Sequence, residues 1–144
     1  MELAILLPML ILLLLGAMDF GRVFYKAMAV THAAEAGVQY GAQSVGKSFD
    51  TSGMTSAAAA AATDITGFSA TAYPPGSAQN PCECWSASSG TETVMPTCTS
   101  SCPSPSVVRI YATVTGTAVF TTVVPYPGIP HTVPITRTAW RRAQ

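Results

Sequence analysis

The chain has 144 residues, of which 10 % are charged and 49 % hydrophobic, and its seven acidic and seven basic side chains leave no net charge. Soluble globular domains carry roughly 25 % charged residues. A neutral chain excludes electrostatic nucleic-acid binding, which requires a basic surface that displaces counterions. The composition also argues against a freely soluble cytosolic protein, because weakly charged surfaces tend to associate.

An uncharged run, LAILLPMLILLLLGAM, occupies residues 3–18 between Glu2 and Asp19. As a helix it would be about 24 Å long, slightly short of a hydrocarbon core of roughly 30 Å. Three interpretations are open: a cleaved secretory signal, a single-pass anchor, or a helix that lies first in a membrane and later in a protein assembly. A signal is disfavoured because Glu2 stands where such signals are basic and no small-x-small cleavage site follows.

The sequence after this run is amphipathic with a helical period. The apolar positions that recur at this period are Phe20, Val23, Phe24, Ala27, Ala34, Val38, Ala42 and Val45. Residues 2–47 are therefore predicted to form one helix of about 70 Å. A simple anchor needs no such extension, so the third interpretation is favoured.

Several residues of this predicted helix invite separate interpretation. Pro8 removes one backbone donor and is expected to kink or loosen the first turns. The repeated glycines would let another helix approach closely. Asp19, Arg22 and Lys26, at i, i+3 and i+7, are expected to form a surface charge cluster.

Residues 48–144 are predicted to form an exposed α+β head. The alanine-rich segment 54–65 should be a short helix that lies flat on a neighbour, and alternation predicts a strand over 68–73. A long strand is expected over 107–124, with a bulge or bend at Gly116. A last strand over 132–142 should pair with it in antiparallel fashion, because the turn at 125–130 is too short for a parallel crossover.

Residues 74–106 read as a long Ser/Thr-rich loop that carries all four cysteines, Cys82, Cys84, Cys98 and Cys102. An even number of cysteines in an exported chain indicates disulfides. Two connectivities are open: Cys82–Cys98 with Cys84–Cys102, or Cys82–Cys102 with Cys84–Cys98. The alternative is a zinc site, although its ligands are usually spaced C-x2-C or C-x4-C.

No pattern typical of catalysis is present. The chain offers no glycine-rich phosphate loop, no Ser–His–Asp candidate and no carboxylate pair in a predicted pocket. His32 and Glu35 are three residues apart, and we interpret them as a solvated or intersubunit pair rather than as metal ligands or an acid–base pair. We therefore expect neither enzyme activity nor a cofactor or metal, and a mechanical or adhesive role instead.

The N-terminal residues carry a motif: an acidic residue, an apolar run with proline, then Asp19-Phe20-Gly21-Arg22, Phe24-Tyr25, Ala33-Ala34, Gly37 and Tyr40. With this motif the chain resembles the TadE-like (tight adherence) branch of the type IV pilin superfamily. The alanine-rich second helix, the cysteine-bearing loop and the C-terminal strands are similar too, so the resemblance extends over essentially the whole chain.

The resemblance implies a subunit that is stored in the membrane, cleaved by a prepilin peptidase and extruded into a pilus or pseudopilus. Family pilins carry a glutamate that is proposed to meet the N-terminal amine of a neighbouring subunit, and Glu2 is the matching residue. Only Met1 precedes Glu2, and no basic leader ending in glycine is present. We expect either a longer precursor or a route without the usual processing.

The resulting hypothesis is a structural pilin that polymerises with itself into an extracellular Tad-like filament for surface adhesion. Before assembly it would lie in the inner (plasma) membrane, in contact with lipid and with the pilus assembly machinery. The alternative is a minor pseudopilin or a monomeric, single-pass membrane-anchored binding module. The predicted assembly residues are Glu2, Leu3, Ile5, Leu6, Pro8, Leu12, Leu13, Phe20, Arg22, Phe24, Ala27, Ala34 and Val38.

Overall fold

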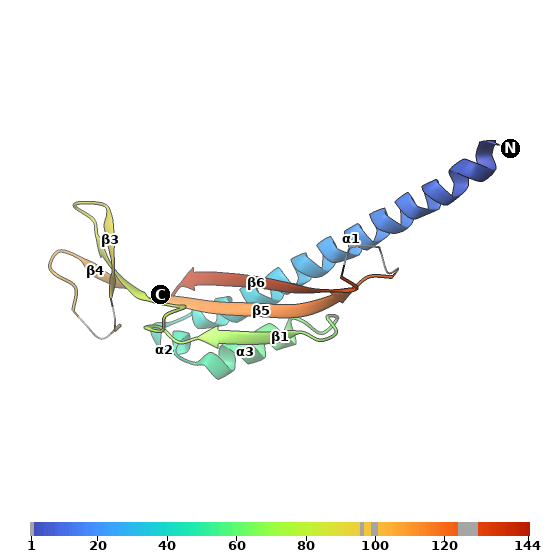
Figure 1. Ribbon diagram of the computed structural model, residues 1–144. Coiled ribbons are helices and arrows are strands. Elements are labelled where there is room, and N and C mark those ends of the chain that lie inside the picture. Colours follow the sequence, from blue (N-terminus) through green and yellow to red (C-terminus); the bar gives the residue numbers. More distant parts are fainter. Residues whose placement is uncertain (1, 96, 99–100, 124–129) are drawn as a thin grey trace.

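The computed structural model describes residues 2–95, 97–98, 101–123 and 130–144, with side chains from residue 6 onward. It confirms the α+β class, with a long apolar helix followed by short helices and two antiparallel sheets. The longest element is α1 (Glu2–Gly41), whose N-terminal part extends beyond the rest of the chain (Figure 1). The helix continues through Pro8, because a proline removes only one main-chain donor.

The predicted single helix over 2–47 is wrong at its C-terminal end, because α1 ends at Gly41 and a separate short helix, α2 (Val45–Ser48), follows. Ser44 has an extended backbone (φ −162°, ψ 157°), and its hydroxyl accepts a hydrogen bond from the Lys47 backbone N–H. This is an N-cap, which starts a new helix whatever the apolar period of the flanking sequence.

The alanine-rich helix α3 (Thr51–Ala60) exists, but it begins and ends earlier than the predicted 54–65. Asp50 caps its N-terminus, accepting a hydrogen bond of 2.8 Å from the Gly53 backbone N–H. The helix lies flat on α1, as predicted. A Cβ on Gly37 of α1 would be only 2.8 Å from the carbonyl oxygen of Met54 in α3, so a residue without a side chain permits this approach.

The main sheet has the order β1–β5–β6, from β1 (Ser69–Tyr73), β5 (Tyr111–Thr121) and β6 (Thr132–Arg142). All neighbours are antiparallel. This confirms the strand near 68–73, the C-terminal strand, and the antiparallel pairing predicted for the C-terminal strand. The turn predicted at 125–130 lies, except for residue 130, outside the described residues.

Two features of the predicted strand over 107–124 are wrong. It is divided into β4 (Val107–Arg109), which belongs to another sheet, and β5. Gly116 is not a bulge, since it pairs in register with Ala70 and Arg137. Its small size has another cause: a Cβ there would lie 3.2 Å from the Val30 side chain, where α1 crosses the sheet.

A second sheet, β3–β2–β4, lies at the end of the molecule opposite the N-terminus of α1 (Figure 1). Its strands β2 (Cys82–Ser86) and β3 (Thr91–Met95) form a hairpin within residues 74–106. The prediction of an irregular loop there is therefore wrong. These strands are five residues long and rich in cysteine, serine and threonine, so they lack the apolar alternation by which strands are recognised.

The four cysteines form disulfides, Cys82–Cys98 and Cys84–Cys102. The disulfide interpretation is confirmed, and the structure chooses between the two open connectivities. Cys82 and Cys84 are buried together with Met95 in a small core of their own. The second sheet is thus built around its disulfides.

The core of the head lies between the main sheet and the helices α1 and α3. One cluster centres on Val30, Ala33, Phe120 and Ile135, and a second on Val38, Met54 and Val114. The C-terminal half of α1 thus supplies one wall of the head core. The division at residues 47 and 48 stays a prediction.

Candidate functional site

The N-terminal part of α1 presents a long apolar surface that no other described part of the chain covers. Its exposed fractions run from 48 % for Ile11 to 70 % for Met9 and Leu13. A soluble monomer rarely exposes so large a continuous apolar patch. We call it the apolar helix surface; its exposed members are Leu6, Leu7, Met9, Leu10, Ile11, Leu12, Leu13, Leu14, Met18, Phe20, Phe24 and Met28.

The helix that carries this surface is long and apolar enough to cross a membrane, as judged by length and composition. Its 18-residue window has a mean hydropathy of 1.8 and is 6 % buried within the chain. A core helix of a soluble protein would be mostly buried instead. The surface therefore indicates membrane anchoring through the N-terminal helix.

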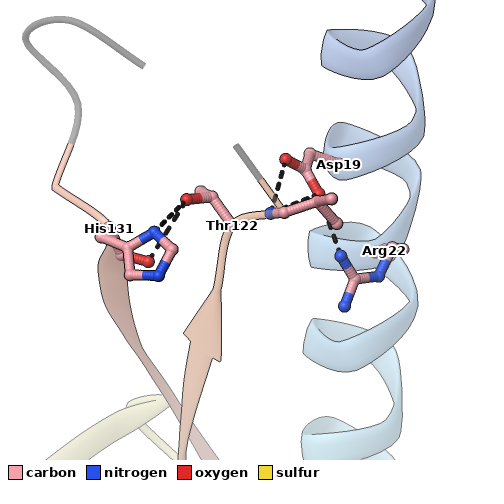
Figure 2. A network of polar contacts seen from close by, with 5 residues as sticks. Asp19, Arg22, Thr122 and His131 are labelled. Carbon is pink, nitrogen blue, oxygen red and sulfur yellow. Dashed lines mark hydrogen bonds and ion pairs between the residues drawn. The ribbon is translucent and has the colours of Figure 1, made fainter. Parts of the chain in front are cut away.

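The apolar run ends at a polar contact between α1 and the end of β5. Asp19 is only 6 % exposed, and its two carboxylate oxygens accept hydrogen bonds from the Val123 backbone N–H at 3.3 and 3.1 Å. The Arg22 guanidinium donates to the same carboxylate at 3.0 Å (Figure 2). Thr122 pairs with His131 beside it, with 2.9 Å between Oγ1 and Nδ1.

Lys26 extends this contact one turn further along α1. Its ammonium donates to the carbonyl oxygens of Val119 at 2.7 Å and Thr66 at 3.4 Å. The guanidinium carbon of Arg22 lies 5.4 Å from the Phe120 ring centroid. The interpretation of Asp19, Arg22 and Lys26 as a surface charge cluster holds for the ion pair of Arg22 with Asp19. It is wrong for the buried Asp19 and for Lys26, because both bond to main-chain groups outside α1. We call these three residues the junction residues.

A groove of about 700 Å³ runs alongside the junction residues. Its lining includes the apolar Met18, Ala29 and Phe120 and the polar Tyr25 and Asp64. The Tyr25 hydroxyl donates to the Asp64 carboxylate at 3.4 Å. The groove begins where the apolar helix surface meets the head.

The structure separates the predicted assembly residues into two groups. Leu6, Pro8, Leu12, Leu13, Phe20 and Phe24 are exposed, and the Arg22 side chain is 47 % exposed. Ala27 packs against the head, and Ala34 and Val38 are buried in its core. The side chains of Glu2, Leu3 and Ile5 lie outside the described residues.

The amphipathic stripe predicted for residues 19–47 is thus divided as well. Val23 and Ala27 pack on the head, whereas Phe20 and Phe24, which share the same period, point away with their ring centroids 5.4 Å apart. The positions at which the strands end decide which of these side chains the head covers. The helical period of the sequence does not give those positions.

The pair of His32 and Glu35 forms as expected, with 3.4 Å between Nδ1 and Oε2 and both side chains largely exposed. Among the described residues, no group of three or more His, Cys, Asp or Glu side chains is placed to hold a metal ion.

Sequence reasoning missed the partners of the junction residues. Val123 contributes a backbone N–H, which no residue type reveals, and Thr122 is an ordinary strand residue until its register is known. One signal was available: Asp19 borders an apolar run, where a carboxylate needs a partner.

These observations describe a protein whose N-terminal helix is long and apolar enough to cross a membrane and is fastened to an α+β head. Residues 1–39 match the family model described as TadE-like protein. This match covers nearly all of α1 and confirms the recognition of a TadE-like segment, which relates the chain to Tad pilus proteins. Comparison with curated proteins and with solved structures gives no match.

Proposed function

We propose that the protein is a structural pilin subunit that assembles through α1 into an extracellular Tad-type filament for surface adhesion. The observation that carries the proposal is the apolar helix surface, which belongs to a TadE-like segment. The same surface would contact the lipid bilayer before assembly and the helices of other copies afterwards.

The exchange of environments is physically reasonable. A leucine side chain loses little hydrophobic free energy when lipid is replaced by protein, since both are apolar. Packing against other helices then supplies the additional van der Waals contacts that favour the assembled state. At Gly16 and Gly21 an added Cβ would meet nothing within 4 Å, and the lack of a side chain there allows close approach of such a helix.

The junction residues support the proposal because they set how the helix leaves the head. A helical polymer requires every copy to present its surfaces at the same angle. The bonds from Val123 to Asp19 and from Lys26 to Val119 restrict that angle. The adjoining groove is open and partly apolar, so it offers a seat for part of a neighbouring copy.

The processing and export steps belong to the proposal too. A prepilin peptidase would act near the N-terminus and the inner-membrane machinery would extract the subunit. Glu2 would then meet the N-terminal amine of a neighbouring copy, because a carboxylate among apolar helices needs a partner of opposite charge.

Electron microscopy of material sheared from the producing cells, combined with intact mass, tests the proposal. The informative variant is Phe24→Asp, because Phe24 is 58 % exposed and follows the uncharged run of residues 3–18, which the substitution leaves unchanged. Its control is Val94→Asp, at a residue that is 63 % exposed on β3 in the second sheet.

The expected result is filaments whose main band is this chain, lost in Phe24→Asp and retained in Val94→Asp, with all three chains in the membrane fraction. If the wild-type chain stays in the membrane and forms no filaments, the alternative of a monomeric, membrane-anchored binding module is favoured. A chain present only as a trace component of filaments would indicate a minor pseudopilin.

A further inference from the structure

The C-terminal end of β6 lies at the end of the head away from the N-terminus of α1 (Figure 1), and it carries an exposed tryptophan. Trp140 is 70 % exposed, which is uncommon for so large an apolar side chain. Tyr111 packs edge-on against it, with 5.7 Å between ring centroids and an interplanar angle of 75°. This contact holds the indole in place while leaving most of it accessible.

Trp140 stands between two hollows and lines both. The first, of about 340 Å³, is bordered by Gln79, Glu83, Glu92 and Tyr111. The second, of about 410 Å³, is bordered by Thr31, Glu35, Gln39 and Arg141. Hydrogen-bonding groups of both hollows therefore lie near Trp140.

The first hollow is lined in part by Asn80, whose hydrogen bonds hold it in place. Asn80 is 2 % exposed, and its amide donates to the carbonyl oxygens of Tyr73 at 3.0 Å and Tyr111 at 2.8 Å. Its side-chain oxygen accepts from the Thr113 hydroxyl at 3.0 Å. Asn80 thus joins the 74–80 segment to β5, and a ligand would meet a surface that is already ordered.

A hydroxyl-bearing face continues from the indole across the main sheet. Thr113 lies directly opposite Trp140, and the next pair is Thr115 opposite Thr138, whose hydroxyls are 2.8 Å apart. Directly opposed residues in an antiparallel pair project on the same face of the sheet.

The charges around Trp140 nearly balance. Arg109 forms an ion pair of 3.0 Å with Glu92 and lies 4.0 Å from the Trp85 ring centroid. The second hollow holds the acidic Glu35, which pairs with His32, and the basic Arg141. Such a surface attracts neither strong cations nor anions by charge alone, and it favours a neutral ligand rich in polar groups.

We propose that Trp140 and the two hollows beside it bind a neutral oligosaccharide. A sugar ring has an apolar C–H face, which the negative face of an indole attracts, and hydroxyls around its rim. One ring would stack on Trp140, and its neighbours would place hydroxyls near Glu83 and Gln79 on one side and Gln39 on the other. This inference goes beyond the proposed function, because binding needs no filament.

The test uses the full chain in lipid nanodiscs, since sugar-based detergents would compete. Cellotetraose, maltotetraose, mannotetraose and chitotetraose are titrated by calorimetry, with tetralysine and tetra-aspartate as charged probes. At least one tetrasaccharide is expected to bind saturably with a blue shift of tryptophan emission. Trp140→Ala should weaken it about tenfold or more, and Trp140→Phe should retain most of the affinity.

Two further variants separate binding from folding. Glu83→Gln keeps the shape of the first hollow and should weaken binding several-fold through a lost charged acceptor. Phe49→Ala removes another exposed aromatic ring, 48 % exposed and not among those that line the hollows, and should bind as wild type does. The inference is overturned if no tetrasaccharide binds, if only a charged probe binds, or if Trp140→Ala binds as tightly as Phe49→Ala.

Discussion

The carboxylate of Asp19 lies 3.1 Å from the backbone nitrogen of Val123, a residue 104 positions later in the chain. This bond joins the point where α1 emerges from its apolar run to the point where β5 ends. It gives Asp19 a structural task in setting how α1 leaves the head. The acidic residue after the apolar run is also part of the segment that matches the TadE-like family.

Replacing Asp19 should loosen this junction. In Asp19→Ala the Val123 N–H and Arg22 both lose their buried partner, so the free energy of unfolding should fall by about 1–3 kcal/mol. Urea unfolding in micelles measures the change, and hydrogen exchange of the Val123 amide shows where it acts. Asp64→Ala is the matched control: Asp64 is exposed, and its bond from Tyr25 is long, at 3.4 Å, so a change within about 0.5 kcal/mol is expected. Equal losses in both variants would refute a special role for Asp19.

Sequence patterns predicted the class of fold because the strongest signals are long. The apolar run, the alternation in 111–121 and the short connection to 132–142 determine α1, β5 and β6 with their pairing. The local signals at Ser44 and Asp50 were present but compete with longer apolar patterns, and so the helix boundaries were misplaced. The strand β2 carries one cysteine of each disulfide and pairs with β3, and sequence alone left the pairing of the cysteines open.

The site was predicted less completely than the fold. The exposure of Leu12 and Leu13 could be predicted from composition. A helix formed by an uninterrupted apolar run has no polar face to turn outward, so its leucines are exposed. Burial of Ala34 and Val38 depends on which face α3 and the main sheet cover, and that is decided by contacts between distant segments. Trp140 was not singled out at all, because one tryptophan near a C-terminus gives no pattern.

The contact between α1 and α3 should be sensitive to a single methyl group. In Gly37→Ala the new Cβ would lie 2.8 Å from the Met54 carbonyl oxygen and 3.2 Å from both Ala58 and Val114. Overpacking of this kind costs about 1–3 kcal/mol, which thermal unfolding followed by circular dichroism would detect. Gly21→Ala is the control, because its Cβ would meet nothing within 4 Å, and higher helix propensity should leave stability equal or raised by up to about 1 kcal/mol. Destabilisation by Gly21→Ala alone would contradict the predicted close approach.

The two sheets should respond differently to loss of the disulfides. The small core around Cys82, Cys84 and Met95 is separate from the clusters beneath the main sheet. The disulfides close segments of 16 and 18 residues, and each should stabilise the sheet by about 3 kcal/mol. Reduction is therefore expected to abolish hydrogen-exchange protection in β2 and β3 while β5 and β6 keep theirs.

Paired substitutions sharpen the disulfide prediction. Replacing Cys82 and Cys98 together by alanine should mimic partial reduction, without leaving a free thiol from that pair. Mass spectrometry after exchange reports each strand separately. Simultaneous loss of protection in β2 and β5 would mean that the sheets unfold as one unit, contrary to expectation.

The cap of α3 should make stability depend on pH through Asp50. The Gly53 backbone N–H, and then the Tyr40 hydroxyl at 2.8 Å, hold the pKa of Asp50 below its ordinary value of 3.8. The native state therefore binds this proton less readily than the unfolded chain does. Its stabilising effect is present above the unfolded pKa and is lost as pH falls through the lower, native pKa.

Asp50→Asn isolates that charge, because asparagine is also a good N-cap. Wild type should resist urea better than Asp50→Asn at neutral pH, and the difference should shrink as pH falls below 3.8, the ordinary value of this carboxyl. Asp50→Ala removes the cap as well, and it should remain less stable than Asp50→Asn at every pH. A gap between wild type and Asp50→Asn that does not change with pH would show that the ionised carboxylate is not what stabilises this end of α3.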